Sequence, residues 1–232
     1  MAEKVRQMFA DIAEDYDRTN TVLSLGVHKR WRRKAVALSG AGPGFQVLDC
    51  ATGTGDLARD FAQAVTPGGR VVGSDFCKEM VELAPSKAQD AGCVVEFQVG
   101  DALALPFEDA SFDVTSIAFG IRNVDDPVAC LQEMARVTKQ DGRVVVLEFG
   151  QPTGLMAWPY TFYSRHIMPA VGGLLTGNRE AYEYLPRTAA AFPAGDAFLE
   201  MMDAAGCFAR REATSLTGGI AYVYVGEVET SP

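Results

Sequence analysis

The sequence predicts an α/β protein built on a doubly wound, mostly parallel sheet of seven strands. Over residues 45–149, apolar strand-like segments alternate with amphipathic helical segments, the pattern of successive βαβ units. The first strand runs into a small-residue turn at residues 51–55. The second strand ends at an acid, Asp75, twenty residues after Gly55. This layout is typical of a Rossmann-like nucleotide-binding unit, whose ligand lies at the carboxyl ends of the strands.

The elements follow in order from the spacing of apolar residues. Residues 4–16 have the apolar spacing of a helix, and a second helix is predicted over 29–38. Asp141-Gly142 predicts a turn before the fifth strand, and Pro85 is expected to kink or shorten its helix. Strands are predicted near 45–49, 70–75, 94–99, 113–119 and 143–149, with helices near 56–65, 78–91 and 127–138.

The pattern changes after residue 150. Residues 155–190 are rich in aromatic residues, punctuated by proline and without a strand signal, which predicts a helical insertion over the ligand edge. A helix at 195–205 and strands near 207–213 and 218–226 follow. No linker or internal repeat divides the chain, so we expect one domain over 1–232. Within it, 1–40 would form a helical flap and 155–190 a helical substrate lid.

Composition narrows the function classes. The 232 residues are 48% hydrophobic, enough for one sizeable core. There are 30 acidic residues against 21 Lys plus Arg, which argues against nucleic acid as a partner. The five cysteines are isolated, which predicts a reduced, cytoplasmic location and no metal site. We expect neither a signal peptide nor a membrane-spanning helix.

The spacing of the glycines indicates which nucleotide would bind. The turn reads Ala51-x-Gly53-x-Gly55, without the third glycine of a dinucleotide fingerprint. It resembles motif I of the class I S-adenosylmethionine (SAM) methyltransferases, which bind a nucleoside without phosphate. Gly53 and Gly55 would let the backbone approach that ligand, and Asp75 would accept from both ribose hydroxyls. Taken alone, the turn could also be a tight strand–helix connection without a ligand, which is the less favoured alternative.

Two later segments favour the cofactor. Gly100-Asp101-Ala102 follows the third strand, where Asp101 would accept from the adenine amino group and the Ala102 amide would reach a ring nitrogen. The fourth strand opens at Ser111-Phe112-Asp113-Val114, so that three successive strand ends would converge on one ligand. The predicted cofactor-binding residues are Asp49, Gly53, Thr54, Gly55, Asp75, Phe76, Asp101, Ala102 and Ala118.

Further segments carry a more specific resemblance, over about residues 6–226. They are Tyr16-Asp17-Arg18-Thr19-Asn20, Ser24-Leu25-Gly26-Val27-His28 with Trp31, Phe119-Gly120-Ile121-Arg122-Asn123-Val124, Leu147-Glu148-Phe149, Tyr182-x-Tyr184-Leu185 with Phe192-Pro193, and Thr217-x-Gly219. The chain resembles the quinone-biosynthesis C-methyltransferases, which act on demethylmenaquinol and 2-methoxy-6-polyprenyl-benzoquinol. The resemblance implies SAM-dependent C-methylation of a lipid-soluble quinol and an antiparallel C-terminal strand pair. The short amino-terminal start favours the menaquinone type.

Three positions depart from that family. Ala51-Thr52 stands in place of a glycine pair, Ala118 in place of a serine on the fourth strand, and Tyr224 in place of a histidine in the closing hairpin. Ala118 puts one cofactor contact in doubt, and Tyr224 puts one pocket contact in doubt.

The expected chemistry needs a group that helps a ring hydroxyl lose its proton. Arg122 would stabilise the developing phenolate, and Asn123 would orient the hydroxyl. Tyr16 and His28 lie in the flap and would close the pocket or move a proton. Two alternatives stay open: Arg122 pairs with a nearby acid, Asp125 or Asp126, and His28 only caps or packs a helix. For His166, a pocket-wall or surface role competes with catalysis.

The polyprenyl tail requires an apolar surface. The lid offers Met156, Trp158, Tyr160, Phe162, Tyr163, Ile167, Met168, Leu174 and Leu175, although ordinary helix packing would explain any one of them. The basic run Lys29–Lys34 would contact anionic headgroups at a membrane surface, or form a solvated helix face. We therefore expect peripheral membrane contact at most. A homodimer is left open.

Several functions compete with methylation of demethylmenaquinol. They are methylation of a benzoquinol for ubiquinone, methylation of a soluble secondary metabolite on the same scaffold, and a non-catalytic SAM-binding partner in a quinone-biosynthesis assembly. The Arg122-Asn123 pair argues against the last. A nucleic-acid methyltransferase is disfavoured by charge and by the lack of an Asn-Pro-Pro-Tyr motif.

Overall fold

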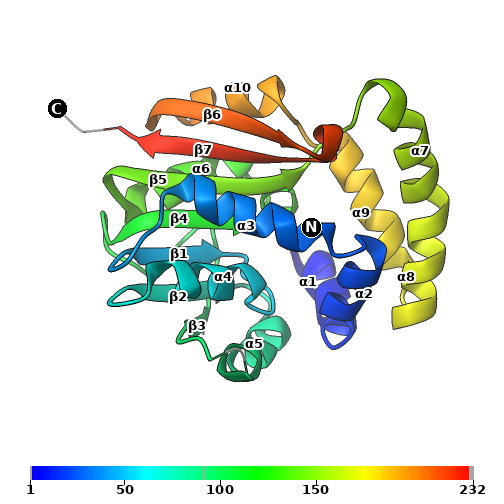
Figure 1. The fold of residues 1–232 in the computed structure, drawn as a ribbon, viewed down its shortest axis with the longest axis horizontal. Helices are drawn as coiled ribbons and strands as arrows, with labels where there is room; N and C mark the ends of the chain where they lie inside the picture. The colour runs from blue at the N-terminus through cyan, green and yellow to red at the C-terminus, as the bar shows by residue number, and fades with distance from the viewer. Residues whose placement is uncertain (1, 91, 230–232) are drawn as a thin grey trace.

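The computed structural model describes residues 2–90 and 92–229, which form a seven-stranded sheet in the order β3-β2-β1-β4-β5-β7-β6 (Figure 1). Strands β1 to β5 are mutually parallel, and β7 lies antiparallel between β5 and β6. The strands are β1 Gln46–Cys50, β2 Arg70–Asp75, β3 Glu96–Val99, β4 Phe112–Ala118, β5 Thr138–Phe149, β6 Phe208–Leu216 and β7 Ala221–Val228. The predicted fold class is confirmed.

Helices cover both faces of this sheet, because alternate strand residues point to opposite sides. On one face, α6 and α10 pack on Leu48 and Ile117; on the other, α3 and α4 pack on Val47 and Val145. The helices flanking the strands are α3 Val27–Ser39, α4 Asp56–Val65, α5 Lys78–Asp90, α6 Pro127–Val137 and α10 Asp196–Ala205.

The remaining helices gather at the carboxyl ends of the parallel strands, at the right of Figure 1. They come from two segments far apart in the sequence, the amino terminus and the insertion between β5 and β6. These helices are α1 Ala2–Ile12, α2 Tyr16–Leu23, α7 Ala157–Phe162, α8 Met168–Thr176 and α9 Arg179–Ala191. Short turns are η1 Ile121–Asn123, η2 Gly154–Met156 and η4 Thr217–Gly219, and the π-helical turn η3 Tyr163–Ile167 joins α7 to α8.

The predicted helix over residues 4–16 is wrong in one respect: it is two helices. α1 ends at Ile12, and α2 begins at Tyr16 and runs on to Leu23. α1 packs against α5 whereas α2 packs against α8, so the chain must bend between them. Apolar spacing alone does not register this bend, because Ile12 is buried on one side of it and Tyr16 continues the same period.

The predicted turn at Asp141-Gly142 is a bulge inside a longer strand. β5 begins at Thr138, and its register against β4 shifts between Phe112 and Val114. Asp141 adopts a φ of 59°, and a Cβ on Gly142 would lie 2.8 Å from the carbonyl oxygen of Asp113. The turn signal is therefore real, but it bends a strand instead of ending one.

Three smaller outcomes concern the other elements. Pro85 does not shorten α5, which continues to Asp90; the expected last residue, 91, lies outside the described residues. β3 begins at Glu96, two residues later than expected. The insertion is helical as predicted. No helix in the described part of the chain has the length and apolar character that a bilayer crossing requires.

Candidate active site

Two hollows lie at the carboxyl edge of the sheet and meet at shared residues. The first encloses about 900 Å³ of empty space, and the second, more apolar one about 1540 Å³. Residues that line both are Tyr16, Ala51, Gly53, Ala118 and Phe119. These come from the flap and from the ends of β1 and β4, so the two hollows join where the central strands stop.

The first hollow contains the acid at the end of β2. Asp75 is 6% exposed and accepts from the backbone N–H groups of Gly53 at 2.7 Å and Cys77 at 2.8 Å. Burial raises the pKa of Asp75, and these amides oppose the rise. The Phe76 amide also opposes the rise, and the acceptor positions that these amides leave free are available to a ligand. Phe76, Asp101 and Ala102, three further predicted cofactor-binding residues, line the same hollow.

The two glycines of the turn have different roles. Gly53 has a φ of 56°, lines both hollows and has open space where a Cβ would stand. Gly55 lines neither hollow. A Cβ there would lie 2.7 Å from Cζ of Phe97, and its φ is 81°. Gly55 is therefore needed for packing against β3, and its part in ligand approach stays a prediction.

Asp49 and Thr54 lie away from the first hollow. Both oxygens of Asp49 are engaged, by the hydroxyls of Thr52 and Ser116 at 2.7 Å each, and burial raises its pKa to about 7. Both Asp49 and Thr54 line the second hollow instead. Asp49 thus anchors the turn after β1, and its placement does not match the predicted cofactor contact.

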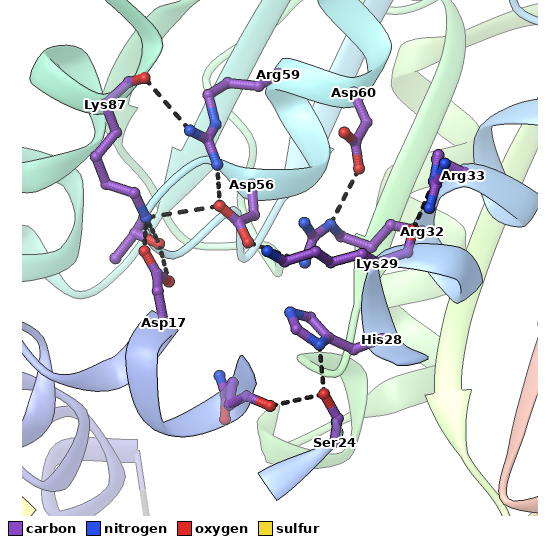
Figure 2. Close-up of polar contacts among 12 residues, drawn as sticks. Asp17, Ser24, His28, Lys29, Arg32, Arg33, Asp56, Arg59, Asp60 and Lys87 are labelled. Atoms are coloured by element: carbon purple, nitrogen blue, oxygen red, sulfur yellow. Dashed lines mark hydrogen bonds and ion pairs between the residues drawn. The ribbon is translucent and has the colours of Figure 1, made fainter. Parts of the chain in front are cut away.

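A polar cluster around Asp17, Asp56 and Lys87 joins the flap to the helices beside the sheet (Figure 2). Thr54 belongs to it. Its hydroxyl donates to Asp17 of α2 at 2.7 Å and accepts from Nζ of Lys87 in α5 at 2.6 Å. Lys87 also pairs with Asp17, and burial lowers the pKa of Lys87 to about 8. Arg32 of α3 pairs with Asp56 at 2.9 Å in the same cluster. These contacts fix α2 and α3 over the strand ends.

Arg122 lies in η1, directly after β4, and lines the second hollow. Its Nη1 donates to Oε1 of Glu148 at 2.8 Å and to the carbonyl oxygen of Phe119, while its guanidinium lies 5.3 Å from the Phe149 ring centroid. The Arg122 and Glu148 side chains are 3% and 2% exposed. Burial raises the pKa of Glu148, and the charge of Arg122 opposes the rise. The alternative that Arg122 pairs with Asp125 or Asp126 is therefore wrong.

The other predicted catalytic residues divide between the two hollows. Tyr16 lines both; burial raises its pKa, and the charge of Arg122 opposes that. Asn123 lines the first, where its Oδ1 accepts from the Tyr184 hydroxyl at 3.1 Å. His28 lines the second, with Nδ1 against the Ser24 hydroxyl. Burial, followed by the charge of Arg32, lowers the pKa of His28 to about 4, so its imidazole is neutral near pH 7.

The structure also places Glu148, two tyrosines of the insertion, and Tyr224. Glu148 carried only a family resemblance, although an acid at the end of an apolar strand is itself a signal. Tyr160 and Tyr163 come from the insertion, and burial raises the pKa of Tyr160 to about 12. Tyr224 lines neither hollow: it is fully buried, and its hydroxyl accepts from the backbone N–H of Gly195 at 2.7 Å.

Comparison with known proteins shows which family has this sequence. The model of the ubiE/COQ5 methyltransferase family matches residues 1–227. The "Ubiquinone/menaquinone biosynthesis C-methyltransferase UbiE" of Bdellovibrio bacteriovorus is 52% identical, over 98% of this chain and 97% of that protein. The "Demethylmenaquinone methyltransferase" of Thermus thermophilus is 46% identical, over 95% and 99%.

Solved structures share the fold at lower identity. A SAM-dependent methyltransferase from Thermotoga maritima superposes with a TM-score of 0.68 at 19% identity, over 95% of this chain and 98% of that one. The [4+2]-cyclase SpnF superposes with a TM-score of 0.69 at 15% identity, over 99% and 97%. A cyclase among the neighbours means that the fold alone does not fix the reaction. The family match does, and this chain belongs to the ubiE/COQ5 methyltransferase family.

Proposed function

We propose that this enzyme transfers the methyl group of SAM to a ring carbon of a reduced polyprenyl quinol, and that the quinol is demethylmenaquinol. The observation that carries the proposal is the meeting of the two hollows at the ends of β1 and β4. A less apolar hollow for the methyl donor and a larger, more apolar hollow for the acceptor share one boundary. Transfer in line requires such a boundary, because donor and acceptor must be held in contact.

The residues of the first hollow fit SAM. Asp75 keeps acceptor capacity for ribose hydroxyls, and Asp101 and the Ala102 backbone lie at the next strand end. Gly53 leaves room beside them. When bound, SAM supplies an electrophilic methyl group. Ala118 lies at the boundary of the two hollows without a polar group, so its contribution is space.

In the second hollow, the protein's part is to favour the phenolate. A ring carbon becomes nucleophilic when an adjacent hydroxyl loses its proton. Arg122 lines this hollow with a guanidinium held in place by Glu148; Glu148 balances its net charge, but its N–H groups can still donate to an oxygen on which negative charge develops. Neutral His28 accepts a proton as a weak base. Tyr16 stays protonated at neutral pH and donates a hydrogen bond, and Asn123 lies beside the boundary to orient the hydroxyl.

The choice of quinol is supported by relatives. Those from Thermus thermophilus and Deinococcus radiodurans, 46% and 45% identical, are named for demethylmenaquinone, whereas the relative from Bdellovibrio is named for both quinones. The test is an assay with labelled SAM and chemically reduced demethylmenaquinol and methoxy-polyprenyl-benzoquinol side by side. We expect product from the naphthoquinol alone. Product from both would make the enzyme dual, and product from neither, with SAM binding intact, would refute quinol methylation.

We also propose that the entrance of the second hollow rests on a bilayer surface. Leu25, at the entrance, is 89% exposed, and Trp158 and Phe162 stack on the outer side of α7 with 77% and 50% exposure. Aromatic residues of this kind favour the membrane–water interface. Lys29 and Arg30 are also exposed at the start of α3, while Arg32 of the same run turns inward to Asp56.

The double variant Trp158→Ser/Phe162→Ser should therefore lose at least about half of its binding to anionic vesicles in a sedimentation assay. Its activity on a short-chain, water-soluble quinol should be unchanged, because neither side chain lines the hollow. Val94→Ser is the matched control: Val94 is 89% exposed and lies just before β3. Undiminished vesicle binding by the double variant would exclude this surface.

A further inference from the structure

The arginines that line the second hollow are balanced in pairs. Two arginines line it, Arg32 and Arg122, and each has a carboxylate against it. Arg32 pairs with Asp56, which faces the hollow, but Arg122 pairs with Glu148, which does not line it. Glu148 lies behind Arg122, at the end of β5, where its Oε1 also accepts from the backbone N–H of Phe149 at 2.8 Å. It therefore acts on a ligand only through Arg122 and through its own charge.

We infer that Glu148 determines the specificity of this site: by neutralising Arg122, it makes the hollow select an uncharged aromatic hydroxyl and reject an aromatic acid. The inference rests on the proposed function, in which the second hollow holds the ring to be methylated. Glu148 is a positioning residue in this account, since it touches neither the ring nor the methyl donor.

The physical argument begins with what Arg122 would do without its partner. A guanidinium buried among apolar side chains, with Phe149 beneath it, would pair with any carboxylate that entered, because that pair forms two parallel hydrogen bonds. An aromatic carboxylic acid would then bind in preference to a quinol. It would be a poor substrate, because its carboxylate occupies the cation that the phenolate needs.

With Glu148 in place, a carboxylate in the hollow meets a neutral pair. The incoming carboxylate would lose its hydration and face a second negative charge just behind the guanidinium, at a net cost. A neutral hydroxyl loses far less hydration, and it can still place partial negative charge next to Arg122 as its proton leaves. The pair therefore discriminates by net charge at the ring, while the apolar lining accommodates the rest of the molecule.

The test uses two probes that share the naphthalene ring and the position of their substituent but differ in its charge, 2-naphthol and 2-naphthoate. Both are titrated by fluorescence at pH 7 in the presence of SAM. The native enzyme should bind 2-naphthol at least about tenfold more tightly than 2-naphthoate. Glu148→Gln keeps the size and an acceptor oxygen but removes the charge. It should bind 2-naphthoate about tenfold more tightly than the native enzyme does, with 2-naphthol changed by less than about twofold.

Controls separate a selectivity change from damage to the fold. The SAM Kd of Glu148→Gln should stay within about twofold of the native value, since Glu148 lines neither hollow. A merely structural role would weaken both probes together. Either that result, or native-like affinity of the variant for 2-naphthoate, would overturn the inference. If Glu148→Gln does not fold, the native enzyme still provides a test: equal binding of the two probes by the native enzyme would by itself overturn the inference. Because no methyl transfer is measured, failure of the quinol assay is a separate outcome.

Discussion

Replacing Arg122 by methionine should lower kcat for quinol methylation by about 100-fold or more, the usual loss when a fixed charge that stabilises a developing anion is removed. Methionine fills a similar volume on an unbranched chain, so the wall of the second hollow stays in place. The Kd for SAM should remain within about twofold, because Arg122 lines the second hollow and not the first. Single-turnover methylation and calorimetric SAM binding measure the two quantities.

The matched control is Arg143→Met. Arg143 also pairs with a glutamate, Glu227, but lies at the start of the regular part of β5, far from the strand ends that form the site. The kcat of the Arg143→Met variant should match that of the native enzyme. Because Arg122→Met leaves Glu148 buried and unpaired, thermal unfolding must confirm that the variant is folded in the assay. A folded variant with more than about a third of native kcat would rule out an electrostatic role for Arg122.

Replacing Asp75 by alanine should raise the Kd for SAM by at least about tenfold, the loss of one strong charged hydrogen-bond pair. The carboxylate is buried at the end of β2, and its remaining acceptor positions are the ones available to ribose hydroxyls. The substitution also releases the backbone amides of Gly53 and Cys77, which adds to the loss. Isothermal titration calorimetry with SAM and with its demethylated product checks the effect.

Asp90→Ala supplies the comparison, since Asp90 is an exposed acid at the end of α5. Its affinity for SAM should be native. The affinity of Asp75→Asn should fall between those of the native enzyme and Asp75→Ala, because an amide oxygen still accepts but carries no charge. Unchanged calorimetric affinity in Asp75→Ala would refute the ribose assignment.

The sheet could be predicted from the sequence because each strand is a short apolar run followed by a turn signal. α4 and β2 begin and end where expected, at 56–65 and 70–75. The break between α1 and α2 could not be predicted, because it is caused by two different packing partners, α5 and α8, and neither is near in sequence. The bulge in β5 could not be predicted for the same reason. Asp141-Gly142 has the sequence of a turn, and only the contact of Gly142 with the distant backbone of Asp113 shows that the strand continues through it.

The site was predictable where residues follow strand ends, and unpredictable where their partners are distant. Asp75, Asp101, Ala118 and Arg122 all lie at one edge, as parallel strands require. The partner of Arg122 was missed because Glu148 is 26 residues later and comes alongside only through the pairing of β4 with β5. The surroundings of Thr54 could not be predicted for a similar reason. Its hydroxyl forms hydrogen bonds with Asp17 of the flap and Lys87 of α5, which are both distant in sequence.

The insertion between β5 and β6 contributes to the second hollow and not to the first, which bears on how new activities arise. Tyr160, Tyr163, Met168 and Leu185 all line the second hollow, and no residue of 154–191 lines the first. None of these residues belongs to a strand, so exchanging the segment leaves every sheet register intact. Acceptor preference can therefore drift, or be redesigned, provided that one contact with the first hollow is kept, the hydrogen bond from Tyr184 to Asn123. A library of variants confined to residues 154–191 should yield folded proteins that still bind SAM. Directed evolution toward other aromatic acceptors should therefore begin with this segment.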